Sequence, residues 1–156
     1  MRSKLLQQQF ELNHYVIKAN TEGLTESEAL MQPPQGGNCT NWVVGHILAS
    51  RMRTVGLLAK PAFWTTTGAS RYERGSLPVR EREAALPALA DLLALLDESQ
   101  DLILSGLSAL TEADLDRTGE RGTVAESLAL LSFHESYHAG QLGLLRRMAG
   151  KPGAIP

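Results

Sequence analysis

The chain is poor in aromatic residues, has a single cysteine and contains no long apolar run. Aromatic residues make up 5% of its 156 positions, so the side chains that favour strands are scarce. The single cysteine, Cys39, rules out an intramolecular disulfide and fits a reducing cytoplasm. We interpret it as a partly buried small residue rather than a reactive thiol. No apolar run approaches the ~20 residues of a membrane span, and the first residues lack a signal-peptide core. We therefore expect a cytoplasmic protein with no membrane partner.

The chain also lacks an excess of charge of either sign. Lys and Arg number 15 against 17 Asp and Glu, which gives a net charge of −2. Nucleic acids and anionic membranes both call for a basic face, so we expect neither as a partner. A chain of 156 residues suits one domain, residues 1–156, with a core of its own.

Apolar residues recur at helical spacing in four long segments. These predicted helices cover residues 3–20, 41–58, 87–107 and 123–149. Residues 60–86 connect the second helix to the third, and a connection of that length can cross the length of a bundle. The sequence therefore predicts an all-α protein, a four-helix bundle with a long crossover between helices two and three.

Residues typical of helix ends mark several of these boundaries. Thr123 and Glu126 have the spacing of a capping box before the last helix. Thr40 is the predicted N-cap of the second helix, and Pro87 is allowed in the first turn of the third. These signals place each start to within a few residues.

The first two helices differ in their apolar patterns. The second is apolar nearly all round, which predicts burial at the centre of the bundle or in a dimer interface. On the first, a broad apolar face has Asn13 near its middle and consists of Leu5, Leu6, Leu12, Val16 and Ile17. We expect Asn13 to point inward, and His14 to lie at a pocket edge or on the surface.

Two of the four histidines, His134 and His138, are four residues apart in the last predicted helix. At that spacing both rings project from one face of the helix, and the residues around that face are apolar. Two imidazoles in a core are costly unless something satisfies them. A shared metal ion would do so with both rings neutral, and hydrogen bonds to backbone or polar groups are the alternative. The pair favours a metal.

A metal site with an open catalytic position usually has three protein ligands. His46, in the second helix, is the natural third ligand, and His14 is its competitor. Residues 134–138 also read His-Glu-x-x-His, as in zinc proteases. A protease is disfavoured, because residues 139–156 contain no Asp, Glu or His as a third ligand. Glu135 is the candidate catalytic residue, orienting a ligand or acting as a base, and a solvated carboxylate is the alternative.

Several segments, taken in order and at these spacings, resemble the DinB/YfiT-like superfamily. They are residues 42–48, 107–115, 134–142 and 145–150, and the match covers nearly the whole chain. The resemblance implies an up-down-down-up bundle and a metal triad of one histidine on the second helix and two on the last. That triad carries over to His46, His134 and His138. The resemblance also implies frequent homodimers and, in some members, thiol-dependent transferases or an isomerase.

These patterns predict a metal-dependent enzyme that acts on a small molecule through a three-histidine site. The reaction would be a thiol-dependent S-transfer or a hydrolysis. Zn²⁺ or Ni²⁺ would suit three imidazoles, with a low-molecular-weight thiol as candidate cosubstrate. The side chains expected to shape the pocket are Asn13, Trp42, Tyr137 and Gln141, with the crossover around Trp64 and Tyr72. The alternative is a non-catalytic, metal-stabilised dimeric binding or stress-response protein.

Overall fold

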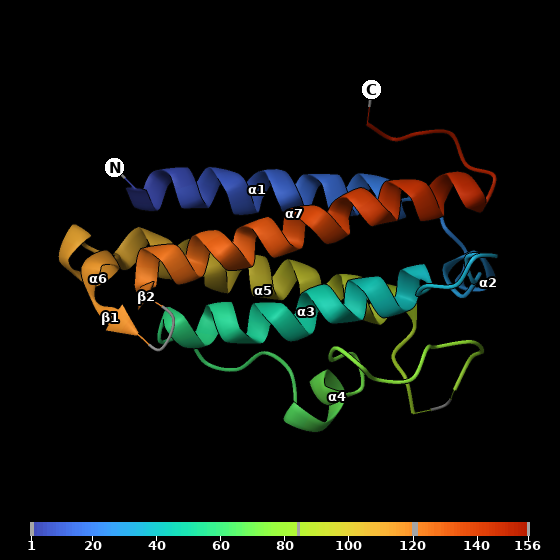
Figure 1. Cartoon of the computed structure of the whole chain (residues 1–156), viewed down its shortest axis with the longest axis horizontal. Helices are drawn as coiled ribbons and strands as arrows, with labels where there is room; N and C mark the ends of the chain where they lie inside the picture. The colour runs from blue at the N-terminus through green and yellow to red at the C-terminus, as the bar shows by residue number, and fades with distance from the viewer. Residues whose placement is uncertain (1, 84, 120–121, 156) are drawn as a thin grey trace.

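The computed structural model describes residues 2–83, 85–119 and 122–155 (Figure 1). The long helices are α1 (Arg2–Thr21), α3 (Thr40–Leu57), α5 (Leu89–Ala109) and α7 (Val124–Met148). The short helices are α2 (Glu26–Ala29), α4 (Thr66–Ser70) and α6 (Glu112–Asp116). Two short strands, β1 (Thr118–Gly119) and β2 (Gly122–Thr123), pair antiparallel just ahead of α7. The protein is all-α, as predicted.

The four long helices pack side by side, in the order α1, α7, α3, α5 around the bundle (Figure 1). Helices α1 and α7 run in one direction, and α3 and α5 run in the other. This up-down-down-up order requires the connection from α3 to α5 to return along the bundle, because both helices start at the same end. Within the part of the chain that the structure describes, no helix has the length and apolar character needed to cross a membrane.

Helix α3 is buried on most of its sides, and this explains its apolar composition. It packs against α5 and α7 inside the bundle, and the crossover with α4 lies over its outward face (Figure 1). Gly45 lies against the ring of Tyr72, and a Cβ atom at this glycine would collide with that ring. The crossover therefore covers the face of α3 that the sequence assigned to the bundle centre or to a dimer interface.

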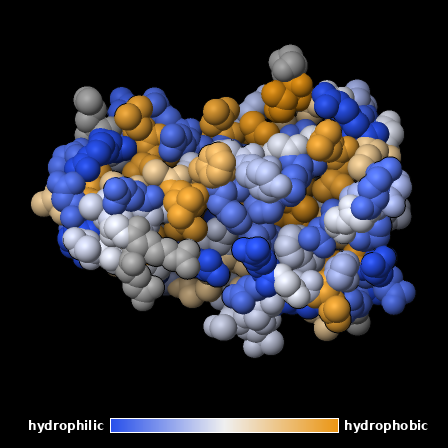
Figure 2. All heavy atoms as spheres, in the orientation of Figure 1, coloured by the Kyte–Doolittle hydropathy of each residue, from blue (hydrophilic) through white to orange (hydrophobic). Residues whose placement is uncertain are grey.

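The buried face of α1 is rotated from the one that the helical wheel indicates. Leu6, Ile17 and Asn13 are buried, as the wheel indicates, and Phe10 joins them on the buried face. Leu5 and Leu12, which the wheel placed inside, are 56% and 62% exposed. Apolar side chains lie among polar ones over the whole face of the molecule that Figure 2 shows. Asn13 faces α7 and donates to the carbonyl of Ser132, and Leu5 and Leu12 lie roughly 80–100° from it around the helix, on the side turned to solvent.

Two helix starts differ from the predicted ones. Helix α3 already includes Thr40, so its N-cap is Cys39, whose thiol donates to the carbonyl of Val79 in the crossover. Helix α5 begins two residues beyond Pro87, and the carbonyl of this proline accepts a hydrogen bond from Asn41 of α3. Each start differs from the predicted one by one or two residues, and each lies at a contact with another segment. The predicted capping box ahead of α7 is confirmed, between Thr123 and Glu126.

Candidate metal centre

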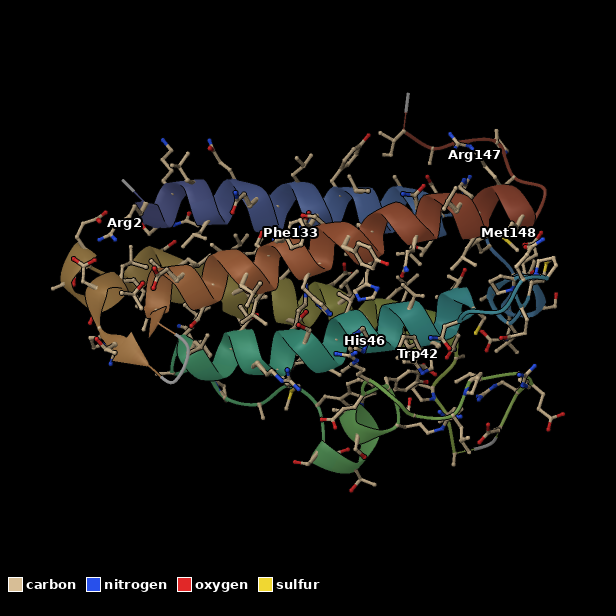
Figure 3. The ribbon with its side chains drawn as sticks, viewed as in Figure 1. Arg2, Trp42, His46, Phe133, Arg147 and Met148 are labelled. Carbon is tan, nitrogen blue, oxygen red and sulfur yellow. The ribbon has the colours of Figure 1, made fainter. Side chains whose placement is uncertain are left out.

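Three histidine side chains meet between α3 and α7, beside the position of His46 in Figure 3. His46 Nε2 lies 3.2 Å from His134 Nε2, and His138 Nε2 lies 3.1 Å from the same atom. The candidate ligand atoms of the three residues all lie within 4.8 Å of one another. Two of the residues lie on successive turns of α7, and the third comes from α3. The structure therefore brings together the three side chains that the sequence singled out.

Hydrogen bonds on the outer nitrogens orient two of the rings. His46 Nδ1 lies 2.6 Å from the carbonyl oxygen of Tyr72, and because a carbonyl only accepts, Nδ1 carries the proton. His138 Nδ1 lies 2.8 Å from Gln141 Oε1, which assigns the same tautomer to this ring. In the neutral rings, both Nε2 atoms then present lone pairs to the cluster. Metal-ligating histidines are commonly held in this way.

His134 is the least satisfied member of the cluster. Its Nδ1 is buried and has no hydrogen-bond partner among the described residues. Burial, helped by the neighbouring His138 and His46, lowers the pKa of His134 to about 4. Burial also lowers the pKa of His138, although its bond to Gln141 acts in the opposite direction. Near neutral pH both rings of α7 are therefore uncharged, which is the form that binds a metal.

The donor set fits one divalent ion. Two nitrogens that each lie about 2.05 Å from zinc at a tetrahedral angle are roughly 3.3 Å apart. The Nε2 separations of 3.1 and 3.2 Å in the cluster are close to that spacing. Without an ion, a single proton on His134 Nε2 can satisfy only one of the two lone pairs that face it. A cation would satisfy all three nitrogens at once.

The cluster borders a cavity of about 800 Å³. Three predicted pocket residues, Trp42, Tyr137 and Gln141, are in its lining. The ring of Trp42 stacks on that of His46 with the centroids 4.7 Å apart (Figure 3). The ring of Tyr137 meets that of His138 edge-on, with the centroids 5.1 Å apart. The histidines are therefore reachable by a small molecule, between aromatic walls.

Other predicted pocket residues lie outside that lining. Asn13 Nδ2 donates to the carbonyl of Ser132 at 2.9 Å, so this residue joins α1 to α7 and corrects the prediction that it shapes the pocket. Trp64 lines a different cavity, next to α4. Tyr72 is fully buried, and it acts on the site through its backbone carbonyl rather than its ring.

Sequence reasoning missed the partner of Glu135. Arg51 of α3 is fully buried, and its Nε and Nη2 donate to the two carboxylate oxygens of Glu135 at 2.9 and 2.7 Å. Its other N–H groups reach acceptors on α5, namely Leu96 O, Ser99 Oγ and Gln100 Oε1. Glu135 thus points into the core, and this geometry supports neither a base at the histidines nor a solvated carboxylate.

A signal for that pair was present in the sequence. Arg51 lies in a helix that is apolar nearly all round. A buried arginine needs a carboxylate partner, because an unpaired buried charge is very costly. The acidic residue flanked by inward-facing histidines, Glu135, was the natural candidate.

Two further residues had positions assigned from the sequence. His14 takes no part in the histidine cluster, as expected, but it is 22% exposed and lies where α1 packs on α5, with Nε2 3.2 Å from Asp97 Oδ1, rather than at the pocket edge or on the surface. Cys39 is buried, and burial raises the pKa of its thiol. A raised pKa keeps the thiol protonated and unreactive, which agrees with its interpretation as a packed small residue.

Four packed helices with three histidines at one cavity define a helical-bundle protein with a candidate metal site. Residues 9–142 match the family model of the DinB superfamily, and the protein belongs to that superfamily. No curated protein matches the chain. A solved structure described as the conserved protein of locus from Enterococcus faecalis is similar, with a TM-score of 0.75 and 17% sequence identity. The likeness covers 96% of this chain and 98% of that one, and at this identity it supports the fold alone.

Proposed function

We propose that this protein is a metal-dependent enzyme that acts on a small molecule at the three-histidine site. The observation that carries the proposal is the open side of the cluster. Among the described residues the group has three candidate ligands and no fourth, and it borders a cavity of about 800 Å³. Structural zinc sites are closed by four protein ligands, whereas catalytic sites keep one position for water or substrate.

The residues around the site have separate tasks. His46, His134 and His138 would hold the ion, while the Tyr72 carbonyl and Gln141 keep two of the rings in the ligating tautomer. A divalent ion supplies Lewis acidity, which lowers the pKa of a water molecule or thiol in the remaining position. The aromatic walls shield that position from part of the solvent, which strengthens electrostatic interactions there.

Transfer of a thiol sulfur is favoured over hydrolysis by the lack of a base. No Asp or Glu is among the described residues that line the cavity, and hydrolysis is aided by a group that accepts the proton of the attacking water. A thiol is more acidic than water and a strong nucleophile once ionised. In the proposed reaction its sulfur bonds to an electrophilic carbon, the leaving group departs with the bonding electrons, and the thiol proton passes to solvent.

Zn²⁺ and Ni²⁺ are the ions we propose, because three imidazoles suit both. The test is metal analysis of protein purified without a histidine tag, for the wild type, His46→Ala and the matched control His14→Ala. We expect about one metal per chain in the wild type and the control, and a large loss in His46→Ala. Equal metal content in the wild type and His46→Ala would refute the site. Consumption of low-molecular-weight thiols in the presence of an electrophile then tests the reaction class.

We further infer that the chain forms a homodimer, at a different face from the one that the sequence indicated. Helix α7 carries exposed apolar side chains at helical spacing, Leu130, Phe133, Tyr137, Leu144 and Met148. Contiguous exposed apolar stripes are typical of interaction surfaces, and Phe133 alone is 69% exposed. A standard interface buries roughly 800 Å² on each partner, and a stripe of this length can supply a large part of that area. A metal-stabilised dimer without catalysis is the second candidate function, and this stripe favours it.

Light scattering coupled to size-exclusion chromatography tests the dimer. A buried charge in an apolar interface is costly, so we expect Phe133→Asp to be monomeric where the wild type is dimeric. Leu77→Asp is the matched control, since Leu77 is 78% exposed and lies in the crossover. A wild-type monomer, or a dimer that survives Phe133→Asp, would contradict this interface.

A further inference from the structure

The cavity beside the histidines is unbalanced in charge. Its described lining contains no carboxylate, and Arg74 is its one cationic side chain apart from the histidines. Glu135, the acidic residue next to His134 in sequence, faces away and compensates the charge of Arg51. The charges that would neutralise a cation at this site are therefore committed elsewhere.

The ligands themselves add no negative charge. Three neutral imidazoles would leave the full charge of a divalent ion uncompensated, unlike a site with thiolate or carboxylate ligands. The guanidinium of Arg74 adds a further positive charge at the same cavity. Walls of low dielectric strengthen such a field, so the cavity attracts anions and repels cations.

The segment that carries Arg74 is tied to the site. Ser76 Oγ accepts a hydrogen bond from Trp42 Nε1 at 3.0 Å, and Trp42 stacks on His46. Between Arg74 and Ser76, Gly75 has a φ of 87°, a left-handed conformation that glycine adopts without strain. No described residue accepts a hydrogen bond from the Arg74 guanidinium, so its five N–H donors are available to a ligand.

We propose that the substrate of this site is an anion, in which Arg74 binds an oxyanion group such as a carboxylate. The apolar part of the molecule would contact Trp42 and Leu145, which line the same cavity. The planar guanidinium fork binds a carboxylate through two parallel hydrogen bonds, and apolar lining residues cover the remainder, as in most small-molecule sites. The inference rests on the proposed function and adds the chemical class of the substrate.

The test uses the full chain loaded with Co²⁺ and two thiol probes, 4-(mercaptomethyl)benzoate and 4-(mercaptomethyl)benzamide. Both probes can place sulfur on the cobalt, and the rigid para ring keeps the carboxylate from reaching the same ion. The charge-transfer absorption of cobalt bound by thiolate reports the affinity of each probe. We expect the benzoate to bind about tenfold more tightly than the benzamide, as a charge-assisted hydrogen-bonded pair provides.

Two substitutions test whether the preference for the benzoate probe comes from Arg74. In Arg74→Met the ratio of the two affinities is expected to fall close to one. In Arg80→Met it is expected to stay at the wild-type value, because Arg80 is an exposed arginine of the same crossover outside the cavity lining. The cobalt content of each sample is measured alongside, so that loss of the ion is not mistaken for loss of the anion site.

The outcomes separate the two proposals. Equal affinity of both probes for the wild type, or a preference that persists in Arg74→Met, would overturn the role of Arg74 and leave the metal site standing. Failure of both probes to bind would contradict the proposed thiol chemistry, and the anion inference with it. Absence of cobalt binding that depends on His46 would instead overturn the proposed function, and the anion inference with it.

Discussion

Two polar clusters lie between α3 and α7, and they differ in how completely their atoms are satisfied. In the first, all five N–H groups of Arg51 are used, in two bonds to Glu135 and three to acceptors on α5, and among the described residues only Gln100 Nε2 of this group lacks a partner. In the second, His134 has a buried nitrogen without a described partner and faces the lone pairs of two other rings. A buried ion pair whose charged groups are all hydrogen-bonded holds a structure in place, whereas an unsatisfied imidazole at a cavity favours a site that receives a ligand.

The two clusters are close neighbours along both helices. His134 and Glu135 are consecutive on α7, and successive residues of a helix point about 100° apart. One side chain therefore reaches the cavity while the next reaches the core. The ion pair with Arg51 locks α7 against α3, which places the histidines of α7 opposite His46. Substitutions in the first cluster should then mainly lower stability, whereas substitutions in the second should mainly weaken metal binding.

The largest expected effect comes from breaking the Arg51–Glu135 cluster. Arg51→Met should lower the free energy of unfolding by about 3–5 kcal/mol, because it leaves the Glu135 carboxylate buried and unpaired. Urea unfolding measures this loss. The matched control is Arg53→Met, an exposed arginine of the same helix, which should change stability by about 0.5 kcal/mol or less. A similar loss in both variants would remove the distinction between the clusters, and Arg51→Met/Glu135→Leu should recover part of the loss.

A smaller effect is expected from a substitution beside the histidine cluster. Gln141→Leu removes the acceptor that orients His138 and should weaken metal affinity by about 10–100-fold. The stability of the metal-free protein should change little, because Gln141 lies at the cavity. Competition with a coloured chelator measures the affinity, with Gln8→Leu on the exposed side of α1 as control. Unchanged affinity in Gln141→Leu would show that this hydrogen bond does not serve the metal site.

The smallest expected effect is a pH dependence of the metal-free protein. The pKa of His134 is lowered to about 4 from an ordinary 6.5, so the unfolded chain takes up its proton first as pH falls. The contribution of His134 to stability should therefore decrease as pH is lowered from about 7 towards 4 and level off below that value. Urea unfolding across this range, after removal of metal with a chelator, measures the slope. The slope should be shallower in His134→Gln, and identical slopes in the two proteins would show that His134 does not cause it.

Local patterns predicted much of the fold correctly. Apolar residues at helical spacing located the four long helices, because that periodicity is set by the geometry of the helix itself. The capping box of Thr123 and Glu126 formed as predicted, since both partners lie within four residues. The same locality explains why His134 and His138 share one face of α7. The sequence could predict these features because few residues decide them.

Contacts between helices decided the remaining features. They turned Leu5 and Leu12 of α1 outward, moved Asn13 from the predicted pocket to the α1–α7 contact, and covered α3 with the crossover. Such outcomes depend on how whole faces pack and on partners distant in the chain, which a helical wheel does not contain.

The sequence by itself determined the helices, the pair of histidines on α7 and the class of chemistry that this pair favours. Only the tertiary structure decided that His46 completes the cluster, that a backbone carbonyl of the crossover orients its ring, and that Glu135 belongs to Arg51 rather than to the site. The physical reason is the separation along the chain of the residues that decide each feature. Helix formation and ligand spacing are fixed by hydrogen bonds over a few residues, whereas a site between helices exists only after packing has placed distant side chains within bonding distance.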